Sequence, residues 1–197
     1  MIAWRDVDLD RSMGPHRRGA RMTDLPDPIA VTIRGLAAGG DAVGKDADGR
    51  TVFVAAAAPD EDVTVRVVER HARWARGELV TIVRPGPGRI APACPRFVAR
   101  TCGGCDWAHV DGPTQAAAKQ AIVAGAVRRL VAGGAALAPL AHPEAPWGWR
   151  RRARFAIAGE AIGFHAPRAH TVTDVDACPQ LAPALAAALT AVRAARA

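Results

Sequence analysis

The sequence has no apolar run that approaches the ~18 residues needed to cross a membrane. It also shows no secretory signal, because charges are spread through the first 26 residues and no apolar core segment interrupts them. Both absences predict a cytoplasmic protein without a membrane partner. Thiols stay reduced in that compartment, so the four cysteines are expected to be metal ligands or nucleophiles rather than disulfides.

Lysine is scarce. Lys45 and Lys119 are the only two among 26 basic residues, so nearly all of the positive charge is arginine. The net charge of +7 and the isoelectric point near 10.5 suit a polyanionic partner. A GC-rich genome also produces abundant arginine and alanine without selection for nucleic-acid binding. Charge alone therefore does not decide between an RNA- or DNA-binding protein and a merely basic one.

Internal repeats are absent, and residues 1–25 show no sustained helical or strand period. We predict a disordered tail there, within which Met22 is an alternative start. Residues 26–86 instead carry four runs rich in β-branched residues, separated by Gly, Asp and Pro. The runs are IAVTIRGL (29–36), RTVFVAAAA (50–58), EDVTVRVVERHARW (61–74) and RGELVTIVRP (76–85). They predict a small closed barrel of the OB type, because closure removes exposed strand edges.

Small OB-type barrels commonly bind oligonucleotides on one face. The basic residues of this segment are therefore predicted phosphate contacts, although each could equally be a solvated surface charge. Those carried forward as RNA contacts are Arg34, Lys45, Arg73 and Arg76.

The second half of the chain mixes helix and strand signals, so the fold class is α+β. A helix is predicted from about residue 112, with Pro113 in its first turn and Gly133 as its stop. An arginine-rich strand is predicted over 149–157, and an apolar helix over 179–197. Residues 87–190 form the predicted second domain, and residues 191–197 are a predicted tail leading out of it.

The cysteines cluster in the second domain. Cys94, Cys102 and Cys105 form a C-x7-C-x2-C pattern, and Cys178 follows 73 positions later. A C-x2-C turn places two thiolates where they can bind one metal, and the two glycines between them leave backbone amides free to point at sulfur. Tetrahedral zinc sites usually show two such turns. One close pair with two isolated cysteines fits iron–sulfur ligation better, although zinc stays open, with His109 as either a ligand or a packed side chain.

Several ordered motifs carry a resemblance to a known family. They are CPRF…CGGCDWAHV, a following helix with Q…K, the late CP at 178–179, and WRRRARFAIAG at 149–159. Residues 33–69 add a Gly-Gly-Asp turn and a G-x-x-V-F-V-x-x-x-x-P-x-E stretch. Together they resemble the TRAM-domain RNA (uracil-5-)-methyltransferases, in which a TRAM barrel precedes a small [4Fe-4S] domain and a catalytic domain that uses S-adenosylmethionine (SAM).

The resemblance implies a ligand set and a partner. Cys94, Cys102, Cys105 and Cys178 would hold a [4Fe-4S] cluster, and the partner would be rRNA or tRNA. It also implies a SAM cofactor, bound only by a catalytic domain that this chain lacks and that could be encoded separately. The chain itself is predicted to be monomeric.

Alternate residues of the arginine-rich segment, read as a strand, share one face. Arg150, Arg152 and Arg154 would then lie roughly 6–7 Å apart, close to the phosphate spacing of an extended nucleic-acid strand. Guanidinium groups bind phosphates bidentately, so these three are predicted RNA contacts. The alternative is an edge strand that charge protects from aggregation.

A free thiol for catalysis is missing. Uracil-C5 methylation in the resembled family adds a cysteine to C6, and the predicted cluster uses all four cysteines. No glycine-rich loop of the SAM-binding type is recognisable either. We therefore predict no catalytic residues, and an RNA-binding, cluster-carrying portion of an RNA uracil-C5 methyltransferase that is inactive alone. The alternatives are a stand-alone metal-containing RNA-binding module and a zinc-binding structural protein.

Overall fold

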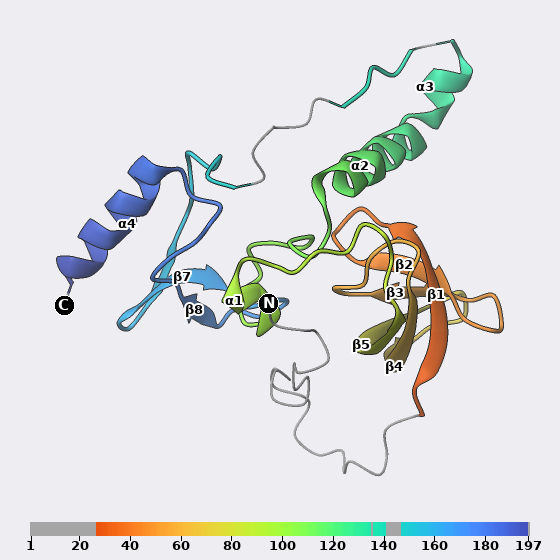
Figure 1. The fold of residues 1–197 in the computed structure, drawn as a ribbon, viewed down its shortest axis with the longest axis horizontal. Helices are drawn as coiled ribbons and strands as arrows, with labels where there is room; N and C mark the ends of the chain where they lie inside the picture. Colours follow the sequence, from red (N-terminus) through yellow and green to blue (C-terminus); the bar gives the residue numbers. More distant parts are fainter. Residues whose placement is uncertain (1–26, 135, 141–146, 197) are drawn as a thin grey trace. The chain divides into compact units, whose positions relative to one another are not determined.

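The computed structural model describes residues 27–134, 136–140 and 147–196 (Figure 1). The predicted tail at residues 1–25 lies outside the described residues. Two compact units make up the described chain. The first contains residues 27–91 and 109–140, and the second contains residues 92–108 and 147–196. The predicted boundaries at 26–86 and 87–190 stay a prediction.

Five strands form the barrel of the first unit. They are β1 (Ile29–Leu36), β2 (Ala42–Lys45), β3 (Thr51–Val54), β4 (Asp62–Arg70) and β5 (Trp74–Arg84). Around the closed barrel their order is β1-β2-β3-β5-β4, and β4 pairs with β1. Neighbours are antiparallel except β3 and β5, which are parallel. The predicted OB-like barrel and the α+β class are confirmed (Figure 1).

Alternate residues of each strand fill the barrel interior. In β1, Val31 and Ile33 are buried, whereas Arg34 between Ile33 and Gly35 is exposed. The same pattern recurs along the other strands, because successive side chains of a strand point to opposite faces. The most buried members of this core are Val31, Ile33, Ala42, Val52, Val54, Val63, Val65 and Ala75.

The segment between β1 and β3 differs from the prediction. The sequence indicates turn material there, but residues 42–45 form β2 and pair with both neighbours. Gly44 is the reason the signal misleads. A side chain at Gly44 would approach the Thr32 carbonyl oxygen to 2.4 Å, so glycine here allows close packing of β2 against β1.

The first unit also contains α2 (Gly112–Ala126) and α3 (Arg128–Ala132). Asp111 caps α2 by accepting a 2.8 Å hydrogen bond from the Thr114 N–H, and Pro113 lies in the first turn as predicted. The predicted single helix is interrupted at Val127, and the second piece ends at Gly133 as expected.

The second unit contains α1 (Pro95–Val98), a three-stranded antiparallel sheet and α4 (Pro183–Ala194). Its sheet is formed by β6 (Ala156–Ala158), β7 (Ala161–His165) and β8 (Val172–Asp174), in that order. A small core of four buried residues joins the sheet to α4; its members are Ile162, Val175, Leu181 and Leu189. The terminal helix is confirmed, and it continues through part of the segment predicted as a tail from residue 191.

The arginine-rich segment is not the strand that the sequence predicts. Strand pairing covers only Ala156–Ala158, and one isolated bridge joins Arg150 to Leu181. The Arg150 N–H donates to the Gln180 carbonyl at 2.8 Å, and the Arg150 carbonyl accepts from the Ala182 N–H at 2.9 Å. These bonds tie the segment to the chain that follows Cys178, so they replace the expected ladder.

The described ranges contain no helix that is long and apolar enough to span a membrane.

Candidate functional site

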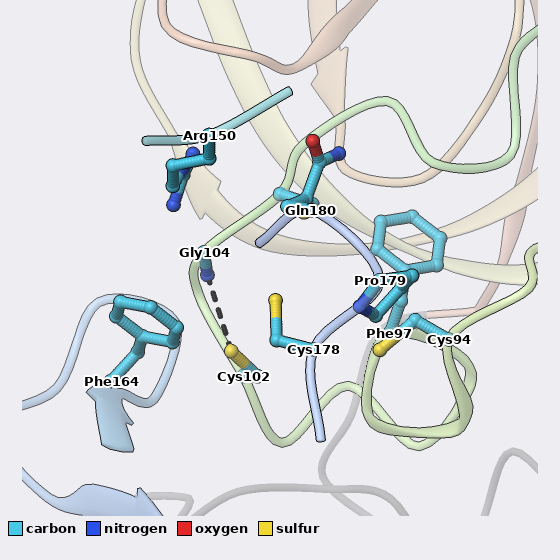
Figure 2. A pocket seen from close by; sticks show the side chains of 10 residues that line it. Cys94, Phe97, Cys102, Gly104, Arg150, Phe164, Cys178, Pro179 and Gln180 are labelled. Carbon is cyan, nitrogen blue, oxygen red and sulfur yellow. Dashed lines mark hydrogen bonds between the residues drawn. The ribbon is translucent and has the colours of Figure 1, made fainter. Parts of the chain in front are cut away.

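All four cysteines of the chain line one pocket in the second unit. Figure 2 shows Cys94 and Cys102 entering from the segment around α1, and Cys178 from the segment before α4. Each cysteine is half-buried and none forms a disulfide. The remaining lining is mainly apolar and comes from Phe97, Phe164 and Pro179, with Gly104, Arg150 and Gln180.

The C-G-G-C turn is held tightly against the β7–β8 hairpin. The Gly103 N–H donates to the His165 carbonyl at 2.9 Å. A side chain at Gly103 would approach that carbonyl oxygen to 3.0 Å, which explains why the position suits glycine. The Gly104 N–H points back at the Cys102 Sγ, 3.4 Å away. An amide aimed at sulfur stabilises a thiolate or a metal-bound sulfur.

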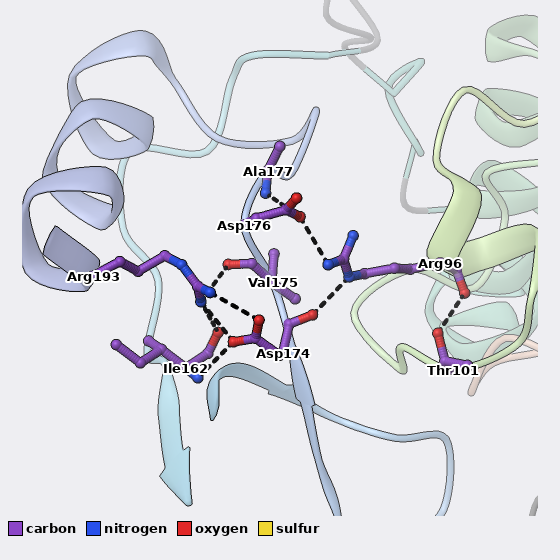
Figure 3. A network of polar contacts seen from close by, with 8 residues as sticks. All are labelled: Arg96, Thr101, Ile162, Asp174, Val175, Asp176, Ala177 and Arg193. Carbon is purple, nitrogen blue, oxygen red and sulfur yellow. Dashed lines mark hydrogen bonds and ion pairs between the residues drawn. The ribbon is translucent and has the colours of Figure 1, made fainter. Parts of the chain in front are cut away.

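A network of polar contacts fixes the approach to Cys178 (Figure 3). Arg96, two residues after Cys94, donates from Nε to the Asp174 carbonyl at 2.7 Å and pairs with Asp176 at 2.8 Å. Arg193 on α4 pairs with the Asp174 carboxylate from the other side. The network thus links the helix that follows Cys94 to the segment that leads to Cys178. Arg96 and Asp174, which the network joins, lie 78 positions apart in the chain.

The pocket opposes ionisation of the Cys102 and Cys105 thiols. The pKa of the Cys105 thiol is raised to about 11, chiefly by burial and secondly by a negative charge on Cys178. Burial also raises the pKa of Cys102, with smaller contributions from Cys94 and Cys178. Thiols with raised pKa values, such as Cys102 and Cys105, are poor nucleophiles at neutral pH. A bound cation would reverse this, because it stabilises several thiolates at once.

The arrangement of the four cysteines indicates whether they suit a single metal ion or an iron–sulfur cluster. Within the described residues, no three His, Cys, Asp or Glu side chains are arranged to hold a single metal ion. A zinc ion requires its sulfur ligands about 2.3 Å from one point. An iron–sulfur cluster distributes its cysteine ligands over several iron atoms, so it needs a wider pocket. The donor set and the apolar lining fit such a cluster better than they fit a lone ion.

The predicted arginine triad is divided by the structure. Arg150 is half-buried, lines the cysteine pocket and lies with its guanidinium 5.5 Å from the centroid of the Trp149 ring. Arg152 and Arg154 are exposed, while Ala153 and Phe155, which alternate with them, pack against the small core. The three arginines therefore do not form one row.

The predicted cations of the barrel lie on its outer surface. Arg34 and Lys45 are exposed on β1 and β2, and Arg73 is exposed in the turn before β5. Arg76 is partly exposed, and its guanidinium pairs with Asp41 and Glu69. Residues 27–91 carry nine basic and nine acidic side chains, whereas residues 92–197 carry twelve and six. The excess positive charge thus belongs mostly to the second half of the chain.

Two features were not singled out from the sequence. One is a group of aromatic rings on the barrel surface, formed by Phe53, His71 and Trp74. The other is a buried ion pair between Glu61 and Arg89. His109, weighed as a zinc ligand, is fully buried beside the barrel and donates from Nε2 to the Ala57 carbonyl at 2.9 Å. It does not line the cysteine pocket, and its packed role is the correct one.

Comparison with known proteins connects both units to one group of enzymes. Residues 28–80 match the TRAM domain family. The chain is 38% identical over 178 residues to an uncharacterized RNA methyltransferase of Gloeobacter violaceus, covering 84% of this chain and 38% of that protein. It is 36% identical over 183 residues to the 23S rRNA (uracil(1939)-C(5))-methyltransferase RlmD of Alkalilimnicola ehrlichii, covering 87% of this chain and 40% of that protein.

A solved structure shares the fold. It is the Pyrococcus abyssi tRNA (uracil-54, C5)-methyltransferase in complex with S-adenosyl-L-homocysteine, with a TM-score of 0.58 and 23% identity. The match covers 84% of this chain and 36% of that one. The chain thus spans well under half the length of these relatives. It carries a TRAM domain and is a homologue of the uracil-C5 RNA methyltransferases.

Proposed function

We propose that this chain is the RNA-binding, [4Fe-4S]-carrying portion of a SAM-dependent RNA uracil-C5 methyltransferase. The observation that carries the proposal is the convergence of all four cysteines on one apolar pocket, in a chain homologous to such enzymes. In this proposal Cys94, Cys102, Cys105 and Cys178 are the cluster ligands. The protein would act in the cytoplasm, as a monomer, on rRNA or tRNA.

The cluster, when bound, would supply a covalent cross-link between distant segments. The residues of the chain prepare that site. Gly104 offers its amide to Cys102, and the side chain of Gln180 hydrogen-bonds Cys105. Arg150 adds a positive charge at the pocket wall, which favours the thiolate form of Cys105. We therefore assign Arg150 to the cysteine site and keep Arg152 and Arg154 as RNA contacts.

Methyl transfer requires groups that these residues do not provide. The covalent step at C6 of uracil needs a thiolate, and the proposed cluster occupies every cysteine among the 197 residues. A SAM-binding methyltransferase domain, in the same polypeptide or in a separate one, would supply that thiolate and the methyl donor. The chain described here would select and hold the RNA.

Anaerobic purification tests the cluster directly. We expect a brown protein that absorbs near ~400 nm and contains about four iron and four sulfide per chain. Cys178→Ser should remove most of the iron, because it deletes the ligand that closes the pocket. Thr190→Ser, on the surface of α4, is the control and should leave the iron content unchanged. A colourless protein with one bound zinc would overturn the iron–sulfur assignment.

A further inference from the structure

The outer face of the barrel carries an ordered patch of aromatic rings. Strand register places Lys45, Thr51 and Trp74 in one row across β2, β3 and β5. The next row on the same face contains Val43, Phe53 and Arg76. Side chains in such rows point the same way, because residues of like parity share one face of a sheet. Phe53 and Trp74 are therefore diagonal neighbours on the solvent side.

The rings in this patch already form a stack. Phe53 meets Trp74 edge-on, with centroids 6.1 Å apart and an interplanar angle of 77°. His71, in the turn before β5, lies nearly parallel to Trp74, with centroids 4.0 Å apart and planes inclined by 23°. Glu69 accepts a 2.8 Å hydrogen bond from the His71 Nε2, which orients the imidazole. The Trp74 ring is thus supported on its edge by Phe53 and covered by an exposed His71.

The surroundings of the stack suit a nucleic-acid strand. Lys45 lies in the same row as Trp74, and Arg70 and Arg73 flank His71 in the chain; all three are exposed. The acids beside them are largely engaged, since Asp41 pairs with Arg76 and Glu69 binds both Arg76 and His71. The patch is therefore locally positive although residues 27–91 carry no net charge.

The small number of cations in the patch decides which interaction dominates. Counterion release scales with the number of phosphates that Lys and Arg contact, so a few exposed cations supply only part of the affinity. Aromatic stacking does not depend on net charge, and it is strong for each unpaired base that is bound. A stack of rings that ends in an exposed imidazole offers a surface for one more ring.

We propose that His71 and Trp74, supported by Phe53, form a platform on which an unpaired RNA base stacks. The platform rests on the proposed function, since it takes RNA to be the partner, and it adds the form of RNA and the residues that read it. Lys45 and Arg73 hold the phosphates on either side of the stacked base. Duplex RNA, whose bases are already stacked and paired, does not fit this surface.

The test compares two oligonucleotides and three variants of the full chain. Fluorescence anisotropy measures binding of a fluorescein-labelled, unpaired RNA of about ten nucleotides and of the same strand with abasic positions. We expect Trp74→Ala and His71→Ala each to weaken binding of the base-bearing RNA by about 5- to 100-fold. Binding of the abasic strand should change less than twofold. Val83→Ala removes an exposed apolar side chain at the end of β5 away from Trp74 and is the matched control.

The His71→Ala variant should fold normally, because His71 is exposed and outside the barrel core, so a loss of binding there does not reflect misfolding. An equal loss of affinity for both strands, or no loss for either, overturns the platform. If the wild-type chain binds the abasic strand as tightly as the base-bearing one, stacking is absent although RNA binding stands. If the wild-type chain binds neither strand, RNA binding itself fails, and the platform fails with it.

Discussion

The Glu61 carboxylate is completely buried and pairs with the Arg89 guanidinium, which is 6% exposed. Arg89 Nη2 donates to Glu61 Oε2 at 2.9 Å and to the Ala56 carbonyl at 2.8 Å. Glu61 also accepts a 2.7 Å bond from the Ala58 N–H. The pair thus fastens the chain that leaves β5 to the loop before β4. Glu61 is the final Glu of the P-x-E stretch in the sequence. Its pairing with Arg89 explains why a Glu occurs there, which β-propensity does not predict.

Replacing Glu61 with Gln should destabilise the barrel strongly. The amide keeps the shape of the side chain but leaves the buried Arg89 charge uncompensated. Removing one partner of a buried pair typically costs about 3–5 kcal/mol. We expect the free energy of unfolding, measured by urea denaturation, to fall by about that amount.

Asp62→Asn is the control for this experiment. Asp62 pairs with Arg84 at 2.8 Å, but both side chains are well exposed. Exposed ion pairs contribute little to stability, so the urea midpoint should hardly move. If the two variants unfold at the same urea concentration, the buried pair is not the anchor described here.

The sequence predicts the barrel well because its signal is local. The alternation in β1 and β4 is enough to identify strands and their inward residues, and the structure confirms it. β2 escapes prediction because Gly44 looks like a turn residue until β1 is placed beside it. The strand prediction for the arginine-rich segment is wrong because its partners are distant in the sequence. Exposed and packed side chains do alternate at residues 152–155. The backbone of Arg150, however, bonds to Gln180 and Ala182, which sequence spacing cannot reveal.

The cysteine site is predictable in its residues and not in its geometry. The C-x2-C turn and the distant Cys178 are visible in the sequence, and the structure brings all four to one pocket. The supporting contacts are invisible beforehand, because Arg96 and Asp174 are far apart in the chain. The same holds for the rings of Phe53 and Trp74, which become neighbours only through parallel pairing of β3 and β5.

Arg150 and Arg152 should have separable roles. Arg150 lines the cysteine pocket, so Arg150→Ala should lower iron content or speed the loss of iron in air, with little change in RNA affinity. Arg152 is exposed. Arg152→Ala should leave iron unchanged and reduce the slope of log affinity against log salt by about 0.7–0.9, the loss of one phosphate contact. Iron analysis and salt-dependent anisotropy measure the two effects. Equal behaviour of the two variants would contradict the division.

Removing the proposed cluster should unfold the second unit before the barrel. The core cluster that joins its sheet to α4 contains four buried residues, which is small for independent stability. A metal group that binds only the folded form contributes its binding energy to folding. We expect chelation of iron to lower the melting temperature of this unit by on the order of 10 °C or more. Calorimetry should then show two transitions, with the barrel transition unmoved. A single unshifted transition would contradict the prediction.

The pair of Asp174 and Arg193 should make the second unit sensitive to acid. Hydrogen bonds from the Arg193 guanidinium hold the pKa of Asp174 at about 2, below its ordinary value of 3.8, and the Ile162 N–H contributes to the same shift. A carboxylate with a lowered pKa in the folded state stabilises the fold fully above the unfolded value. The stabilisation is then lost as the pH falls from about 4 towards 2.

Asp174→Asn isolates this contribution. Above about pH 5 the variant should melt below the wild type by a constant margin, because the wild type keeps its charged pair. The margin should shrink as the pH falls below about 4 and become small near 2, where Asp174 is protonated in the unfolded state and half protonated in the folded state. Glu160→Gln, at an exposed turn position of the same unit, is the control. Melting curves from pH 6 to 2 measure the effect, and a margin that stays constant down to pH 2 would show that the charge of Asp174 is not what stabilises the unit.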